Sequence, residues 1–212
     1  MQIAVIGWGS LTWCPGCLGL KSRWHSDGPA LPIELARISG DKRLTLVIHP
    51  GSPEESTPDQ QTYWAMSEFG DLKAARKNLQ AREGTASKHI HSLTADGQQE
   101  GAVDPEISAR MGEWLKAHRG LEAAVWTGLP SNWDDEQKGR KFTVEDAVQY
   151  LGELEGAKDE AKATYDRARE YLINTPSQIQ TPVRRIMREK KGWKDSTLSG
   201  ILFETGRDDG LI

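Results

Sequence analysis

Two kinds of chemistry meet near the start of the chain. Residues 1–6 form an apolar run rich in β-branched side chains, and Gly7-Trp8-Gly9-Ser10-Leu11 follows it. A strand that runs into a glycine-rich turn can bend so that its backbone amides face a ligand. Behind this turn lies Cys14-Pro15-Gly16-Cys17. The sequence therefore offers a turn suited to an anion or a carbonyl group, and a dithiol.

One carboxylate further along the chain stands out by its position. Residues 70–71 supply a helix start, and apolar residues recur at helical spacing from Leu72 to Leu79 in a helix predicted to run to Arg82. Glu83-Gly84 follows, so the carboxylate falls at the negative end of the helix dipole, where a charge of its sign is disfavoured. Glu83 is therefore a candidate functional acid, and the alternative is a solvated residue at a helix end.

The dithiol has the spacing of a glutaredoxin-type redox site. Such sites need a long helix that starts at the motif, whereas residues 18–29 contain three glycine or proline interruptions and no helical pattern. The sequence favours a structural or incidental role for Cys14 and Cys17. A thiol-disulfide oxidoreductase is the weaker alternative.

Metal and nucleic-acid binding are both disfavoured. His89 and His91 would point to one face of a strand, but no second paired motif completes a zinc site, so we expect no metal. Residues 184–191 form a basic helix, and in a chain with a net charge of -4 we expect a solvated face there. Nucleic acid is therefore not an expected partner.

The composition indicates a globular protein with a polar surface. The chain has 212 residues, of which 37% are hydrophobic and 27% charged. No apolar stretch approaches the roughly 20 residues that span a bilayer, and the N-terminus lacks the pattern of a secretory signal. We expect a cytoplasmic protein with reduced thiols and no membrane partner. The sequence gives no indication of an oligomeric state.

The first 130 residues alternate strands with two helices. Residues 31–38 and 43–49 form a predicted hairpin, and a surface loop is predicted for residues 50–60. Further predicted strands are residues 62–67, 89–93 and 123–128, and residues 105–119 form an amphipathic helix.

The pattern becomes helical after residue 142. Thr143 caps one predicted helix, residues 155–173 form a second, and residues 183–191 form a third. The tail, residues 196–212, has little periodicity. We therefore predict a β-rich domain over residues 1–130 and a helical C-terminal extension over residues 142–212.

The loop and the acid occur together in a known family. The first strand is followed by an aromatic residue and Gly-Ser-Leu, and then come paired strands, an aromatic strand and a short helix ending in Glu-Gly. This order of elements resembles the γ-glutamylcyclotransferase-like family. The matching segments are Trp8-Gly9-Ser10-Leu11 and Leu79-Gln80-Ala81-Arg82-Glu83-Gly84. The resemblance covers about residues 2–128, and the helical extension has no counterpart in it.

The resemblance implies an α+β fold with a small closed mixed β-barrel flanked by helices. It implies an enzyme in which the α-amine of a γ-glutamyl group attacks its own side-chain amide, which releases 5-oxoproline and an amine or peptide. Glu83 would be the general acid and base, and residues 7–11 (Gly7, Trp8, Gly9, Ser10 and Leu11) would bind the substrate. No cofactor or metal is implied, and the partner is a small γ-glutamyl compound.

One departure concerns the loop. The family usually has tyrosine where this chain has Trp8, whose indole N–H can donate but not accept a hydrogen bond. This leaves the substrate open. The alternative function is a non-catalytic barrel that binds a small ligand or a protein.

Overall fold

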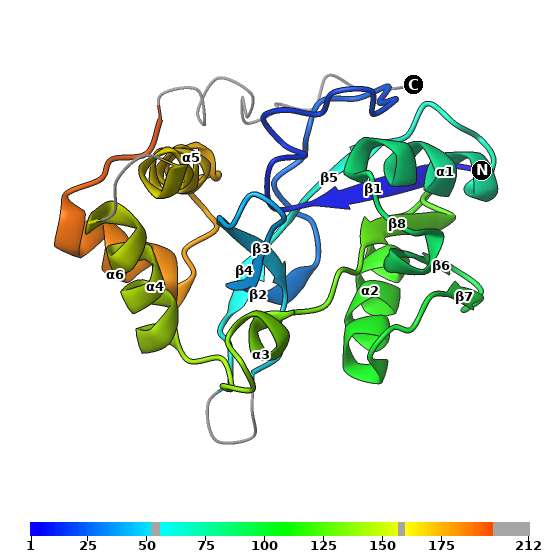
Figure 1. The fold of residues 1–212 in the computed structure, drawn as a ribbon. Helices are drawn as coiled ribbons and strands as arrows, with labels where there is room; N and C mark the ends of the chain where they lie inside the picture. Colours follow the sequence, from blue (N-terminus) through cyan, green and yellow to red (C-terminus); the bar gives the residue numbers. More distant parts are fainter. Residues whose placement is uncertain (52–55, 157–159, 197–212) are drawn as a thin grey trace.

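The computed structural model describes residues 1–51, 56–156 and 160–196. These residues form a mixed α+β fold with two sheets and six α-helices (Figure 1). The predicted tail lies almost wholly outside the described residues. The α+β class is thus confirmed.

The larger sheet has five strands and positions both the N-terminal loop and Glu83. Its strand order is β5 (Tyr63–Met66), β1 (Ile3–Gly7), β8 (Ala123–Thr127), β6 (Ile90–Thr94) and β7 (Gln99–Glu100). β1 pairs parallel with β8 and antiparallel with β5, and every residue of β1 is buried. The first strand is therefore central, as its continuous apolar pattern indicates.

Two helices cover this sheet. α1 (Leu72–Glu83) contacts β6 and β8, as does α2 (Pro105–Ala117), and Figure 1 shows them on opposite sides of the strands. The short 3-10 helix η1 (Ser87–His89) leads from α1 into β6. The Asp71 side chain accepts a hydrogen bond from the Ala74 amide at 2.8 Å and caps α1 at its start.

The smaller sheet contains the predicted hairpin. Its order is β3 (Leu44–Ile48), β2 (Ala30–Ile38) and β4 (Asp59–Gln61), with β2 antiparallel to both neighbours. A register shift between Glu34 and Arg37 marks a bulge in β2. The hairpin is confirmed, whereas the loop predicted for residues 50–60 in fact leads into β4, a strand of polar residues without an apolar alternation.

The pairings of the described strands give these two sheets, and no closed barrel is found among them. The short edge strands β4 and β7 each pair with one neighbour, so each sheet remains open at that edge in the described residues.

The predicted helical segment contains α4 (Val144–Gly156), α5 (Glu160–Asn174) and α6 (Pro182–Lys191), preceded by the short α3 (Trp133–Glu136). Thr143 accepts a hydrogen bond from the Asp146 amide at 3.1 Å, which confirms the predicted cap. α4, α5 and α6 lie together beside the smaller sheet, where α6 contacts β2 (Figure 1).

The basic helix α6 does not present a uniformly solvated face. Arg184 is fully buried and donates to the carbonyl oxygens of Leu172 and Pro176 at 3.0 and 2.7 Å. It also forms an ion pair with Asp195 at 2.6 Å. The expectation for this residue was wrong because its guanidinium donates to carbonyl groups in the last turn of α5 and just beyond it, a role that the local charge pattern does not reveal.

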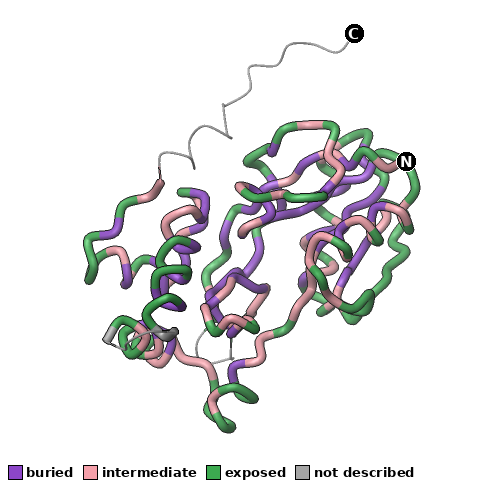
Figure 2. Tube along the Cα trace, turned by 45° about the horizontal axis from the view of Figure 1, so that its top comes forward, coloured by how far each residue is buried: buried purple, intermediate pink, exposed green. Residues whose placement is uncertain are grey.

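Buried residues follow the strands and the inward faces of the helices, as Figure 2 shows. Tyr171 and Leu172 of α5 belong to the same core cluster as Ile3 and Val5 of β1. Among the described helices, none is both long and apolar enough to cross a bilayer.

Candidate active site

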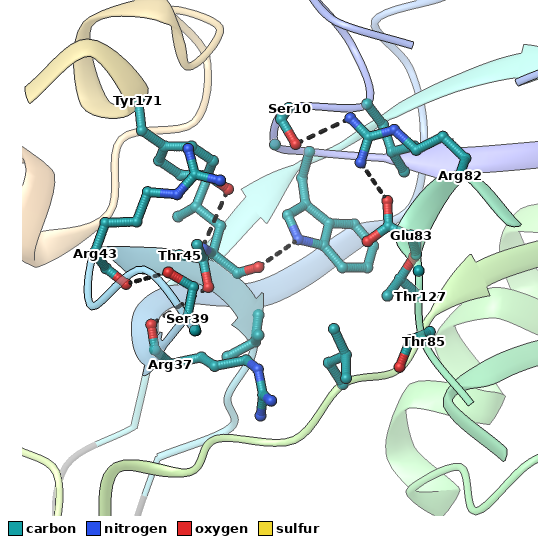
Figure 3. Close-up of a pocket in the computed structure, with 18 residues that line it drawn as sticks. Ser10, Arg37, Ser39, Arg43, Thr45, Arg82, Glu83, Thr85, Thr127 and Tyr171 are labelled. Carbon is teal, nitrogen blue, oxygen red and sulfur yellow. Dashed lines mark hydrogen bonds and ion pairs between the residues drawn. The ribbon is translucent and has the colours of Figure 1, made fainter. Parts of the chain in front are cut away.

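A cavity of about 400 Å³ lies where five segments meet, one of which is the end of β8 with Thr127 and Leu129. The N-terminal loop, the end of α1, the hairpin β2–β3 and helix α5 all contribute to its lining (Figure 3). Trp8, Gly9, Ser10, Leu11 and Glu83 are among the lining residues. The structure therefore brings the predicted acid and four of the five predicted loop residues to one concave site.

The loop presents unused backbone donors. The carbonyl oxygens of Gly9 and Ser10 accept hydrogen bonds from the amides of Thr12 and Cys14, at 2.9 and 2.8 Å. These bonds tighten the turn. The N–H groups of residues 9–11 have no acceptor in the part of the chain that the structure describes. Successive unpaired amides in a turn suit an anion or a developing oxyanion.

Glu83 lies at the C-terminal end of α1, as predicted, although the helix extends to Glu83 itself and not only to Arg82. Gly84 ends the helix in a left-handed conformation with φ 60, and its N–H donates to the Gln80 carbonyl oxygen. The Glu83 side chain is 15% exposed. Burial raises the pKa of the Glu83 carboxyl group, and Arg82 partly opposes this effect. The carboxyl group is therefore a partly desolvated acid that faces a cavity.

Arg82 connects Glu83 to the loop. Its guanidinium donates to Glu83 Oε1 at 2.6 Å, to Ser10 Oγ at 3.1 Å and to the Cys14 carbonyl oxygen at 2.7 Å. Figure 3 shows the chain of contacts from Ser10 through Arg82 to Glu83. Sequence reasoning missed this role, although Arg82 directly precedes the candidate acid.

Trp8 and Gly7 have different surroundings. Trp8 is buried and lines the cavity, and its indole N–H donates to the Leu46 carbonyl oxygen at 3.3 Å, so this donor is used within the protein. A Cβ atom at Gly7 would lie 2.9 Å from the Trp24 ring. Gly7 is not part of the cavity lining, and its lack of a side chain accommodates Trp24.

Tyr171 brings the helical extension into the site. Its hydroxyl oxygen accepts a hydrogen bond from the Leu46 amide at 3.3 Å and would lie 2.6 Å from a Cβ atom at Gly9. Burial raises the pKa of Tyr171 to about 12, so the hydroxyl keeps its proton at neutral pH. No sequence signal identified Tyr171, since the resemblance ends before residue 142.

The hairpin contributes a polar wall with two arginines. Arg37 pairs with Thr45, and the Ser39 amide donates to the Arg43 carbonyl oxygen at 2.9 Å. Side chains alternate along strands, so these four residues share one face of the hairpin, and all four line the cavity. The alternation is visible in the sequence, but the sequence does not show which face meets a cavity.

Cys14 and Cys17 are both exposed free cysteines. No helix begins at this motif, and the next described helix is α1. The geometry expected of a glutaredoxin-type site is therefore lacking at these residues.

His91 is a packed residue. It is 7% exposed, and a Cβ atom at Gly128 would overlap its ring. Burial is the main cause that lowers its pKa. Within the described ranges, no cluster of three or more histidine, cysteine, aspartate or glutamate side chains could hold a metal ion.

No family model matches this chain, and no curated protein matches it either. The candidate function therefore rests on the residues and the geometry of the cavity.

Proposed function

We propose that the protein is a γ-glutamylcyclotransferase-like enzyme that releases 5-oxoproline from a γ-glutamyl compound. The observation that supports this most strongly is that Glu83 and residues 9–11, whose N–H groups have no acceptor in the described residues, line one cavity. A carboxyl group with a raised pKa and an amide-lined turn are the two elements that the cyclisation needs.

In the proposed reaction the α-amino nitrogen attacks the side-chain amide carbon. A nitrogen–carbon bond forms within the γ-glutamyl group, and the bond from that carbon to the departing nitrogen breaks. Two protons leave the attacking ammonium and two reach the departing amine, so the reaction has no net proton demand. Glu83 can take these protons from one nitrogen and deliver them to the other in turn.

The reaction places negative charge on the amide oxygen in the transition state. The N–H groups of Gly9, Ser10 and Leu11 are the proposed donors to this oxyanion. The attack is intramolecular, so the cavity has mainly to hold the substrate bent. This chemistry needs no metal or cofactor.

Two further residues act on this arrangement. Arg82 holds Glu83 and Ser10 in a fixed relation, which makes it a positioning residue. Tyr171 supplies a neutral hydroxyl group beside the N-terminal loop. This loop has Trp8 at the position where the family usually has a tyrosine. The closed barrel and the cytoplasmic location stay predictions of the sequence.

The test is the release of 5-oxoproline from a panel of γ-glutamyl amino acids, peptides and amines. We expect turnover by the wild-type protein and a loss of about 100-fold or more in kcat for Glu83→Gln. Glu113→Gln is the matched control, because Glu113 is exposed on α2 and does not line the cavity. Turnover that Glu83→Gln leaves unchanged, or no turnover across the panel, would contradict the proposal, and the second result would favour a ligand-binding protein.

A further inference from the structure

The cavity carries more positive than negative charge. Three arginines and one glutamate line it in the described residues. Arg82 pairs with Glu83, which leaves the charges of Arg37 and Arg43 outside the proposed reaction. A γ-glutamyl group brings one ammonium and one carboxylate, whose charges cancel, so it does not balance this surplus.

Arg37 has unused donors. Its Nη1 donates to the Pro130 carbonyl oxygen at 2.7 Å, which fixes the guanidinium, and no carboxylate pairs with it within residues 1–51, 56–156 and 160–196. A guanidinium has five N–H donors in a planar fork that matches a carboxylate. Figure 3 shows the Arg37 side chain extending into the open region opposite Thr127 and Thr85.

The carboxylate that pairs with Arg43 also pairs with a second arginine. Its Nε lies 3.3 Å from Asp41 Oδ1, and the same carboxylate lies 3.4 Å from Arg167 Nε. Its guanidinium also lies over the Tyr171 ring, 5.4 Å from the ring centre. Asp41 therefore neutralises only one of the two positive charges of Arg43 and Arg167, and the three side chains together retain a net positive charge beside the cavity.

The two arginines are spaced for one small ligand. Arg37 pairs with Thr45, so Arg43 is its diagonal neighbour across the hairpin, and residues in this relation are about 7–8 Å apart with their Cβ atoms somewhat closer. Both side chains are long, so two anionic groups of one molecule can engage them. The γ-glutamyl group occupies the other end of the cavity, at Glu83 and the loop, in the proposed reaction.

We propose that the part of the substrate that is released is an acidic amino acid, whose two carboxylates bind Arg37 and Arg43 on the hairpin face. This inference rests on the proposed function, and it narrows the substrate class to γ-glutamyl-glutamate and γ-glutamyl-aspartate. Arg37 is the specificity-determining residue in this assignment, because its donors are the less occupied.

The test uses three substrates of equal size: γ-glutamyl-glutamate, γ-glutamyl-glutamine and γ-glutamyl-glutaminamide. Their released parts carry two, one and no carboxylates. We expect kcat/KM of the wild-type protein to fall about tenfold or more at each step, since each step removes a charge-assisted hydrogen bond. Arg37→Gln should reduce the difference between the first and third substrates by about tenfold or more. Arg119→Gln, an exposed residue outside the cavity, should preserve it.

Binding of the same three compounds to Glu83→Gln, measured by calorimetry, separates the two proposals. Turnover of all three at similar kcat/KM, or a charge preference that Arg37→Gln leaves intact, would overturn the acidic subsite while the cyclisation stands. A binding preference for the dianionic compound with no 5-oxoproline from any substrate would support the subsite and refute the proposed reaction. Equal binding without turnover would refute both.

Discussion

Replacing Gly9 with alanine places a methyl group where helix α5 reaches the N-terminal loop. The new Cβ would lie 2.6 Å from the Tyr171 hydroxyl oxygen, and an ordinary contact begins at 3.4 Å, so the loop and Tyr171 must separate by about 0.8 Å. Tyr171 is buried and cannot rotate freely into solvent. We expect Gly9→Ala to lower the free energy of unfolding by about 1–3 kcal/mol, the usual cost of overpacking.

The same substitution should be tolerated when the hydroxyl is absent. In a Tyr171→Phe background the nearest ring atom, Cζ, lies 3.6 Å from the new Cβ, which is an ordinary contact. Tyr171→Phe alone should lower the free energy of unfolding by about 1–3 kcal/mol, since the Leu46 amide loses its acceptor. The double variant should then be about as stable as Tyr171→Phe. Urea unfolding of the four proteins gives the coupling energy directly.

Gly40→Ala is the matched control for this cycle. Gly40 also lines the cavity, and nothing lies within 4 Å of a Cβ atom built there, so alanine should be neutral in both backgrounds. If Gly9→Ala costs nothing, or costs the same with and without the Tyr171 hydroxyl, the contact between α5 and the loop is refuted. The assignment of Tyr171 to the cavity would fail with it.

Two further substitutions test buried carboxyl groups. Burial raises the pKa of Glu34 from 4.5 to about 6. The protonated carboxyl group therefore adds about 2 kcal/mol to the free energy of unfolding below pH 4.5, and this contribution is lost as the pH rises through 6. Glu34→Gln should remove this component, and urea unfolding curves whose pH dependence is the same in both proteins would contradict the assignment. Arg82→Gln leaves the buried Glu83 carboxylate without its cation, so it should cost up to about 3 kcal/mol at pH 8. This cost should shrink toward pH 4 as Glu83 is protonated, and a cost independent of pH would show that the ion pair is not its cause.

Local signals in the sequence predicted much of the fold. The start of α1 at Asp71 and its end at Glu83 follow from a capping side chain and a glycine with positive φ, both of which are properties of adjacent residues. The hairpin β2–β3 follows from its two apolar runs and the turn between them. The helix signals predict that Glu83 lies at the C-terminal end of α1. Only the family resemblance predicts that Glu83 and the N-terminal loop belong to one site.

The remaining parts of the site depend on contacts between distant segments. Tyr171 reaches Leu46 and Gly9 from a helix that the resemblance does not cover, so neither periodicity nor motif could assign it to the cavity. Arg184 has the sequence context of a solvated cation but is buried, because carbonyl groups of another segment surround it. Arg37 lies on a face whose exposure depends on the elements opposite the hairpin.

The role of Glu83 as general acid and base can be tested by comparing the pH dependence of kcat/KM for 5-oxoproline release between the wild-type protein and Glu83→Gln. Because Glu83 must be ionised to accept a proton and burial raises its pKa, the wild-type rate should fall on the acid side with a midpoint above 4.5. Glu83→Gln should be slower by about 100-fold or more and should lack this limb. If Glu83→Gln keeps the wild-type rate and the same acid limb, Glu83 is not the general acid and base.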